Sequence, residues 1–276
     1  MKITRNAKMF AKGAVVGGSM LLPGLSGGTI AILLGIYEKL IKAVSDITKG
    51  KKIKNNLLFL GVFTLGGLVG VLCFSYILSA VLFLWGYYLS FLFMGAVIGT
   101  VPVIFLQSGA NRLNARDVFY TSVGVALSVS LTFIPENLLS TADNKTVSEF
   151  ILLFMAGVFV AVALILPGIS VSYTLLILGL YERTVEAVKS FDIVYVLPLG
   201  VGCVAGILAF TRFLDYLMTR HTRGIYMVIS GFVISCVPTV YPGHPQGTEY
   251  LIAIPLLIIG FFAVYLIAGK AQKSSG

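Results

Sequence analysis

The residues in this chain that could do chemistry lie in two short motifs, each of which occurs twice. The first copy reads Leu-Pro-Gly-Leu-Ser at 22–26 and Gly-Ile-Tyr-Glu-Lys at 35–39. The second reads Leu-Pro-Gly-Ile-Ser at 166–170 and Gly-Leu-Tyr-Glu-Arg at 179–183. Proline and glycine interrupt an apolar helix, and serine favours the start of a new one. The free N–H groups and positive dipole end of such a helix favour an anion.

The residues after each break are candidates for binding a phosphate group. Their hydroxyl groups can donate hydrogen bonds, and the glycines among them let a ligand come close to the backbone. In the first copy they are Ser26, Gly27, Gly28 and Thr29. In the second copy the equivalent places hold Ser170, Ser172 and Tyr173. The alternative is that these residues only cap the helices and fill space at the breaks. The occurrence of two copies favours the binding site.

A tyrosine and a glutamate close each copy and are candidates for gating or coupling. The pairs are Tyr37 with Glu38 and Tyr181 with Glu182. A glutamate within an apolar segment is predicted to act as a gate, a proton carrier or an ion-pair partner of a basic group. The alternative is an interfacial anchor formed with the basic residue that follows each glutamate.

Three arginines are further candidates for contacting a phosphate. Arg212 lies late in an apolar run with Asp215 one turn later, and a partly immersed arginine can hold a phosphate bidentately. It could equally be an anchor whose charged group reaches the membrane surface. Arg112 and Arg116 bracket a loop, where lipid headgroup contact and a simple topology signal are equally good interpretations.

The composition predicts an all-α polytopic membrane protein. Apolar residues make up 58% of the 276 residues, only 11% are charged, and the mean hydropathy is +0.98. Uncharged runs of about 20 residues are long enough to span a bilayer as helices, and they lack the alternation of barrel strands. The three cysteines lie in apolar runs without paired spacing, so we expect no metal site and no cofactor.

The duplication extends beyond the two motifs and divides the chain into two repeats. Gly67 aligns with Gly206, and Gly95 aligns with Gly231 at a slightly smaller spacing. The predicted repeats are 1–145 and 146–276. Each consists of a broken segment and three spans. In repeat one these are 13–44, 56–79, 87–107 and 118–135; in repeat two they are 150–190, 194–217, 225–241 and 250–269.

The charges favour re-entrant hairpins over single crossings for the two broken segments. With hairpins, one side of the membrane holds every basic residue except Lys145, Arg183 and Lys189. The positive-inside rule then places both termini in the cytoplasm. Three spans per repeat is an odd number, so the second repeat is inverted. The two hairpin tips are expected to meet near the midplane, the arrangement of inverted-repeat transporters.

The doubled Pro-Gly-x-Ser and Gly-x-Tyr-Glu pattern resembles the bacterial polyprenyl-phosphate transporter family over essentially the whole chain. This resemblance implies a role in recycling undecaprenyl phosphate, the lipid carrier for wall polymers, across the cytoplasmic membrane. The first copy matches the family motif in full. In the second copy Val171, Ser172 and Tyr173 replace Gly-Gly-Thr, which suggests that the first tip does more of the anion binding.

The leading hypothesis is therefore a flippase for undecaprenyl phosphate, with the phosphate bound at the two tips. Its expected partners are the polyprenyl phosphate lipid and membrane phospholipids, with a proton or sodium ion as the open choice of coupling ion and no nucleic acid. The alternative is a secondary transporter of a small soluble anion. A lipid-modifying enzyme is disfavoured because the two histidines fall in loops on opposite sides of the predicted topology. A structural assembly factor is equally disfavoured.

Overall fold

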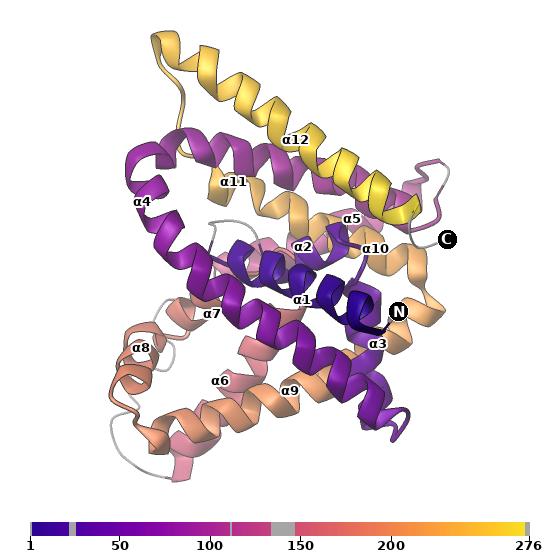
Figure 1. Ribbon diagram of the computed structural model, residues 1–276, viewed down its shortest axis with the longest axis vertical. Helices are drawn as coiled ribbons and strands as arrows, with labels where there is room; N and C mark the ends of the chain where they lie inside the picture. Colours follow the sequence, from indigo (N-terminus) through magenta and orange to yellow (C-terminus); the bar gives the residue numbers. More distant parts are fainter. Residues whose placement is uncertain (1, 22–25, 111, 134–146, 274–276) are drawn as a thin grey trace.

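The protein is seen here as a computed structural model that describes residues 2–21, 26–110, 112–133 and 147–273. Every element in the described part is a helix (Figure 1). The helices are α1 Lys2–Ser19, α2 Gly27–Leu33, α3 Tyr37–Thr48, α4 Ile53–Gln107, α5 Ala115–Thr132, α6 Val147–Ile165, α7 Val171–Ile177, α8 Tyr181–Lys189, α9 Ile193–Arg220, α10 Thr222–Ser235, α11 Val237–Val240, the 3-10 turn η1 Gly247–Glu249, and α12 Tyr250–Lys273.

Within the described residues, six stretches are long and apolar enough to cross a membrane, as expected for a polytopic helical protein. They are Ile53–Ser75, Trp85–Gln107, Ser148–Ile165, Ile193–Arg220, Thr222–Val240 and Gly247–Leu266. Five of them match predicted spans. The sixth is α6, the first arm of the second broken segment, whereas α5 is absent from the set and starts with the charged Arg116 and Asp117. The last two residues of the predicted span 118–135 lie outside the described residues.

Two predicted spans form one continuous helix. α4 has 55 residues, which corresponds to about 80 Å if straight, more than twice the thickness of the hydrocarbon core. Figure 1 shows that α4 bends sharply near its middle and runs back beside α12. The two arms of α4 therefore take the places of the predicted spans 56–79 and 87–107, without the loop that separates spans in most membrane proteins.

Four pairs of helices have extensive contacts with each other, and glycine residues let their backbones come close. The pairs are α1 with α4, α6 with α9, α4 with α12, and α5 with α10. A Cβ atom on Gly95 of α4 would lie 2.0 Å from the carbonyl oxygen of Leu257 in α12. On Gly231 of α10 it would lie 2.2 Å from the carbonyl oxygen of Thr121 in α5. Such small residues let helix backbones touch, which is how helices associate in a membrane.

These contacts recur at a constant spacing along the chain. Gly231 follows Gly95 by the same number of positions as Leu257 follows Thr121, so the α4–α12 contact repeats as the α10–α5 contact. Each of these two pairs joins a helix from the first half of the chain to one from the second half. The two halves are therefore interlocked rather than placed side by side.

The same comparison corrects the alignment of α4 with α9. A Cβ on Gly66 would meet the carbonyl oxygen of Phe10, and a Cβ on Gly202 would meet that of Phe154. The contacts thus pair Gly66 with Gly202, at the spacing that also relates Gly95 to Gly231, whereas the sequence comparison pairs Gly67 with Gly206. The sequence comparison pairs the wrong glycines because both helices contain many small residues close together.

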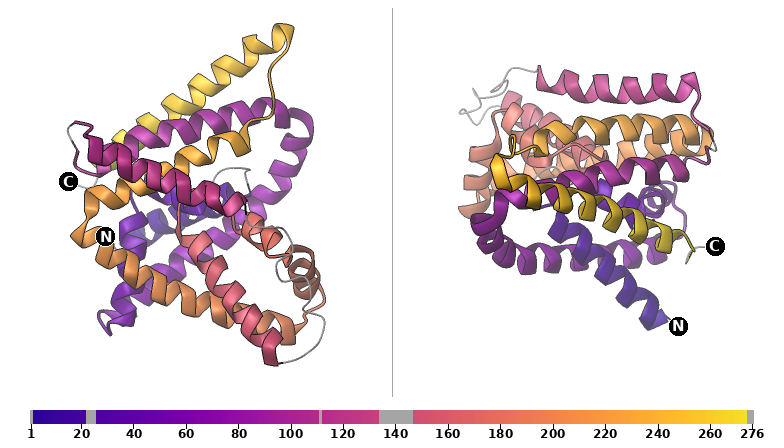
Figure 2. Two further views of the ribbon diagram at one scale, coloured as in Figure 1. Left: turned by 180° about the vertical axis from the view of Figure 1, so that it is seen from behind. Right: turned by 90° about the horizontal axis from the view of Figure 1, so that it is seen from above.

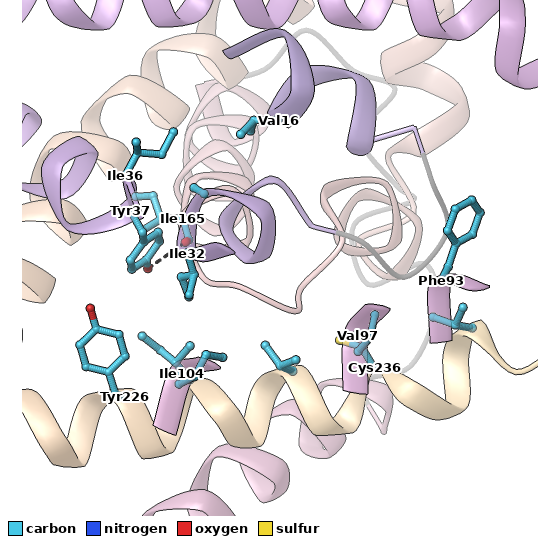
Figure 3. Close-up of a cluster of buried hydrophobic side chains, with 14 of the residues drawn as sticks. Val16, Ile32, Ile36, Tyr37, Phe93, Val97, Ile104, Ile165, Tyr226 and Cys236 are labelled. Carbon is cyan, nitrogen blue, oxygen red and sulfur yellow. Dashed lines mark hydrogen bonds between the residues drawn. The ribbon is translucent and has the colours of Figure 1, made fainter. Parts of the chain in front are cut away.

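The largest cluster of buried side chains surrounds α2 and includes residues of α4 and α10. Ile32 of α2, Ile104 of α4, and Tyr226 and Ile229 of α10 are each at most 2% exposed (Figure 3). Two further views show the segments at each side of the molecule (Figure 2). Both chain ends, the α3–α4 turn and the α9–α10 link lie at one side, and the bend of α4 and α8 lie at the other.

Candidate substrate site between the two helix breaks

The two breaks share one local structure, set by the residue types that they share. Ser26 caps α2 by accepting the N–H of Thr29 at 3.3 Å, and Ser170 caps α7 by accepting the N–H of Tyr173 at 3.4 Å. Each short helix has seven residues and ends at a glycine of positive φ, Gly35 at 63° and Gly179 at 72°. The positive φ explains why glycine is used there. Pro23 and Gly24, the break itself in the first copy, lie outside the described residues.

The two breaks touch each other. The side-chain oxygen of Ser26 accepts the backbone N–H of Gly168 at 2.8 Å. A Cβ on Gly28 would lie 3.1 Å from the carbonyl oxygen of Ile165 and 3.2 Å from Cα of Pro167. Backbone donors from both copies therefore converge on one point, which is the Ser26 hydroxyl group.

Gly168 is fixed from its other side by α10. The thiol of Cys236 donates to the carbonyl oxygen of Gly168 at 2.6 Å, and a Cβ on Gly168 would lie 2.6 Å from the carbonyl oxygen of Phe232. With a φ of 91° as well, this position requires glycine. The second break is thus held between the start of α2 and α10.

The C-terminal end of α2 is capped by side chains from two other helices. The ammonium group of Lys12 in α1 donates to the carbonyl oxygen of Leu34 at 2.7 Å, and the amide of Gln107 in α4 donates to that of Ile32 at 3.1 Å. A cation at this end complements the helix dipole. Burial, and then the ammonium groups of Lys39 and Lys8, lower the pKa of Lys12 below its ordinary value.

Tyr37 and Glu38 connect the first copy to the second half of the chain. Tyr37 is 4% exposed and donates from its hydroxyl group to the carbonyl oxygen of Ile165 at 3.1 Å. Glu38 is exposed, yet its carboxylate accepts the hydroxyl group of Tyr226 in α10 at 2.5 Å. The first turn of α3 is therefore held against both the second break and α10.

The corresponding residues of the second copy face outward. Ser170 and Ser172 are exposed, Tyr173 is 41% exposed, and Tyr181 and Glu182 are also exposed. The structure thus brings Ser26, Gly28 and Thr29 close to the second break at Gly168, but places the hydroxyl groups that follow that break away from this point.

The arginines predicted to contact a phosphate lie apart from the breaks. Arg212 is exposed on α9, and its expected neighbour Asp215 instead binds the ammonium group of Lys49 and accepts the hydroxyl group of Ser45, each at 2.7 Å. Arg112 and Arg116 are both exposed near the start of α5.

A different arginine forms a bidentate ion pair. Arg223 of α10 donates from Nε and Nη2 to the two carboxylate oxygens of Asp117 in α5, at 2.7 Å and 2.5 Å, and from Nη2 to the carbonyl oxygen of Arg112 at 2.7 Å. Hydrogen bonds from Arg223 and from the N–H of Asn114 hold the pKa of Asp117 below its ordinary value. This pair fixes α5 on α10 and occupies the guanidinium group, so its role is structural.

Sequence reasoning missed the residues that join the two breaks. Gly168 lies inside the duplicated motif, so a stricter comparison of the two copies could have marked it. Lys12, Tyr226 and Cys236 carry no such signal, because each is a single polar residue within or directly after a helix, and only the fold shows what it contacts. No group of three or more potential metal ligands occurs among the described residues.

An apolar groove of about 600 Å³ lies between α6 and α9, far from the breaks along α6. Its walls include Phe150, Phe154 and Leu197. It has the character of a lipid-facing surface rather than of a site for an anionic group.

Comparisons with known proteins find a matching family and relatives that are named transporters. A family described as VCA0040-like, undecaprenyl phosphate translocase-like, matches residues 16–255. A polyprenyl-phosphate transporter of Staphylococcus aureus is 28% identical over 269 residues, which cover 94% of each chain. One of Vibrio cholerae is 28% identical over 251 residues, which cover 84% of this chain and 77% of that protein. No solved structure gives a significant match.

Proposed function

The chain belongs to the VCA0040-like family of undecaprenyl phosphate translocase-like proteins, and from this premise we propose that it is a flippase for undecaprenyl phosphate. With six apolar stretches of spanning length among the described residues, it is a multi-pass membrane protein. The proposed reaction returns the lipid carrier across the bacterial cytoplasmic membrane for the synthesis of wall polymers. No covalent step is needed, and we propose no enzymatic activity.

The proposed topology has two inverted repeats with two re-entrant hairpins. It is supported by the contacts that recur between equivalent helices of the two halves. It is also supported by the arrangement in Figure 1, where α1 and α3 share one side while α8 lies at the other. The side of the chain ends carries most of the basic residues, which favours cytoplasmic termini.

The phosphate is proposed to bind where the two breaks meet. The observation that carries this proposal is the hydrogen bond from Gly168 N–H to Ser26 Oγ, because it shows backbone donors of both copies aimed at one oxygen atom. A phosphate oxygen is an acceptor of the same kind, with a charge that strengthens each bond. It would take the N–H groups of Gly168 and Thr29 in place of the serine oxygen when the breaks move apart.

The remaining site residues have supporting roles in this proposal. Glycine at 27 and 28 admits the headgroup to the backbone, and Ser170, Ser172 and Tyr173 offer hydroxyl groups on the exposed side of the second break. Tyr37, Glu38, Tyr181 and Glu182 gate or couple the movement. Arg212, Arg112 and Arg116 attract the anionic lipid at the surface of the side that holds the chain ends.

The test is translocation of labelled undecaprenyl phosphate in proteoliposomes. We expect Ser26→Ala to lower the initial rate at least about tenfold, since it removes the acceptor that organises both breaks, and Ser26→Thr to restore most of it. Ser130→Ala is the matched control, because that exposed hydroxyl group donates to the carbonyl oxygen of Leu127 in its own helix. An unchanged rate for Ser26→Ala would exclude this site. Movement of labelled inorganic phosphate without any polyprenyl lipid would favour the soluble-anion transporter instead.

A further inference from the structure

Tyr226 is a buried residue of α10 whose hydroxyl group reaches the other half of the chain. Its side chain is 2% exposed, and the hydroxyl group donates to Oε1 of Glu38 at 2.5 Å. Figure 3 shows the ring extending from α10 towards Tyr37, the residue next to Glu38. A buried tyrosine requires a partner for its hydroxyl group, and here that partner is a carboxylate in the first turn of α3.

The surroundings make this contact part of a clamp on α3. Tyr37 ties the same turn to the carbonyl oxygen of Ile165, at the second break. The turn is thus bound to the second half of the chain through two tyrosine hydroxyl groups on different helices. Any movement of α3 relative to α10 has to break the bond between Tyr226 and Glu38.

The second half lacks an equivalent of this bond among the described residues. The alignment that pairs Gly95 with Gly231 pairs Tyr226 with Ser90, whose hydroxyl group donates to the carbonyl oxygen of Gly86 in its own helix at 3.0 Å. The equivalent of Glu38 is Glu182, which is exposed on α8. The hydroxyl group of Ser90 is thus used within its own helix. The two glutamates are therefore held differently, although their motifs match.

We propose that Tyr226 is the positioning residue for Glu38 during transport. The proposal rests on the proposed function, in which Glu38 gates or couples the movement. Hydrogen bonds to an ionised acceptor are roughly twice as strong as neutral ones, so the hydroxyl group fixes one orientation of the carboxylate. Tyr226 acts through Glu38 and does not contact the lipid, so its loss changes the turnover rate rather than the affinity for the lipid.

The experiment compares three variants in the proteoliposome assay. Tyr226→Phe is expected to lower the maximal rate about tenfold and to leave the half-saturating lipid concentration within about twofold; tenfold corresponds to about 1.4 kcal/mol. Glu38→Asp keeps the charge but shortens the side chain, so it should behave like Tyr226→Phe. In a Glu38→Asp background, Tyr226→Phe should have no further effect, because two residues that act as a unit are not additive.

Ser90→Ala is the matched control, since it removes the hydroxyl group at the equivalent position of the other half, and its rate should stay within about twofold of wild type. If Tyr226→Phe transports at the wild-type rate while Glu38→Gln is inactive, Tyr226 does not position Glu38, although the proposed function stands. If Glu38→Gln is fully active, the gating role of Glu38 and this inference both fail.

A spectroscopic measurement tests the contact without any transport. The carboxylate stretching band that disappears in Glu38→Gln should shift in Tyr226→Phe, because the bond to Oε1 is lost. An unshifted band would overturn the inference, whether or not the protein transports lipid. If the band shifts but the protein transports no lipid, the contact between Tyr226 and Glu38 is supported and only the proposed function fails.

Discussion

The two broken segments of this protein have the same local structure and opposite surroundings. Segment one (α1, α2 and α3) and segment two (α6, α7 and α8) match in their serine caps, in the length of the short helix and in the glycine that ends it. Six of the seven residues of α2 are buried, whereas in α7 only Ile177 is. α2 lies near the centre of the molecule, and α8 lies at its edge (Figure 1).

The difference separates what a motif determines from what it does not. Capping serine, helix-ending glycine and proline act within a few residues, so both copies fold alike locally. Burial depends on the helices that pack around each copy. α4, α6 and α12 from other parts of the chain contact α2, and side chains of α10 join the same buried cluster, while α7 contacts mainly α6 and α8 of its own segment. Two copies of one motif can therefore have unequal roles, with the first copy forming the closed junction and the second offering an exposed surface.

The largest expected difference between the two segments is in how much a substitution in each short helix lowers the stability of the protein. Ile32 is fully buried in α2, and its equivalent in α7, Leu176, is 43% exposed. Ile32→Ala is expected to lower the free energy of unfolding by about 2–5 kcal/mol through the cavity it leaves. Leu176→Ala should lower it by less than about 1 kcal/mol. Unfolding in detergent micelles with increasing SDS measures both, and equal losses would mean that the two short helices are equally buried.

A smaller effect is expected at the tyrosines that begin α3 and α8. Tyr37→Phe removes a buried hydrogen bond to the carbonyl oxygen of Ile165 and should cost about 0.5–1.5 kcal/mol. Tyr181 is 39% exposed, so Tyr181→Phe should stay within about 0.5 kcal/mol of wild type. The thermal midpoints of the two purified variants provide the measurement. A Tyr181→Phe variant that is the less stable of the two would reverse the comparison.

The smallest effect concerns Lys12, whose equivalent in segment two is the buried Ala156. Because the pKa of Lys12 is lowered in the folded protein, the unfolded chain binds more protons as the pH approaches 10.5, the ordinary lysine value. Stability from this group should therefore rise with pH in that range. Lys12→Met should remove this rise in stability and also the cap on α2. Together the two losses should change the free energy of unfolding by less than about 1 kcal/mol.

The measurement for Lys12 is unfolding of wild type and variant at about pH 8 and pH 10. The stability of wild type relative to the variant should be greater at the higher pH, because wild type alone gains stability there from this group. A relative stability that falls as the pH rises would show that Lys12 is better protonated in the folded protein than in the unfolded chain.

The features that could be predicted from the sequence are those that depend on residues close together in the chain. The membrane class follows from apolar runs, and the caps at Ser26 and Ser170 follow from their residue type. Five span predictions match apolar helices, since hydropathy over about 20 residues is a strong signal. The first broken segment begins earlier than expected, because its predicted range starts at residue 13, whereas α1 starts at Lys2. The second begins close to its predicted start at residue 150, since α6 starts at Val147.

The parts that could not be predicted depend on contacts between distant residues. Tyr226 and Glu38 are 188 residues apart, and nothing near either residue marks the pair. Arg212 illustrates the opposite case. Asp215 lies one turn after Arg212, but Lys49, the residue directly after α3, binds that aspartate. A charge in an apolar helix signals that a partner exists, and only the fold identifies it.

The exchange of helices between the two halves has a consequence for how the protein is made. The surface of α4 around Gly95 is covered by α12, and α12 is synthesised long after α4 has left the ribosome. In the meantime that small-residue surface is exposed to lipid or to insertion factors. The first half can place its helices in the membrane during translation, but its tight helix contacts are completed only when the end of the second half arrives. Truncation before α12 would therefore leave both halves unfinished, because each depends on the other for its last partner.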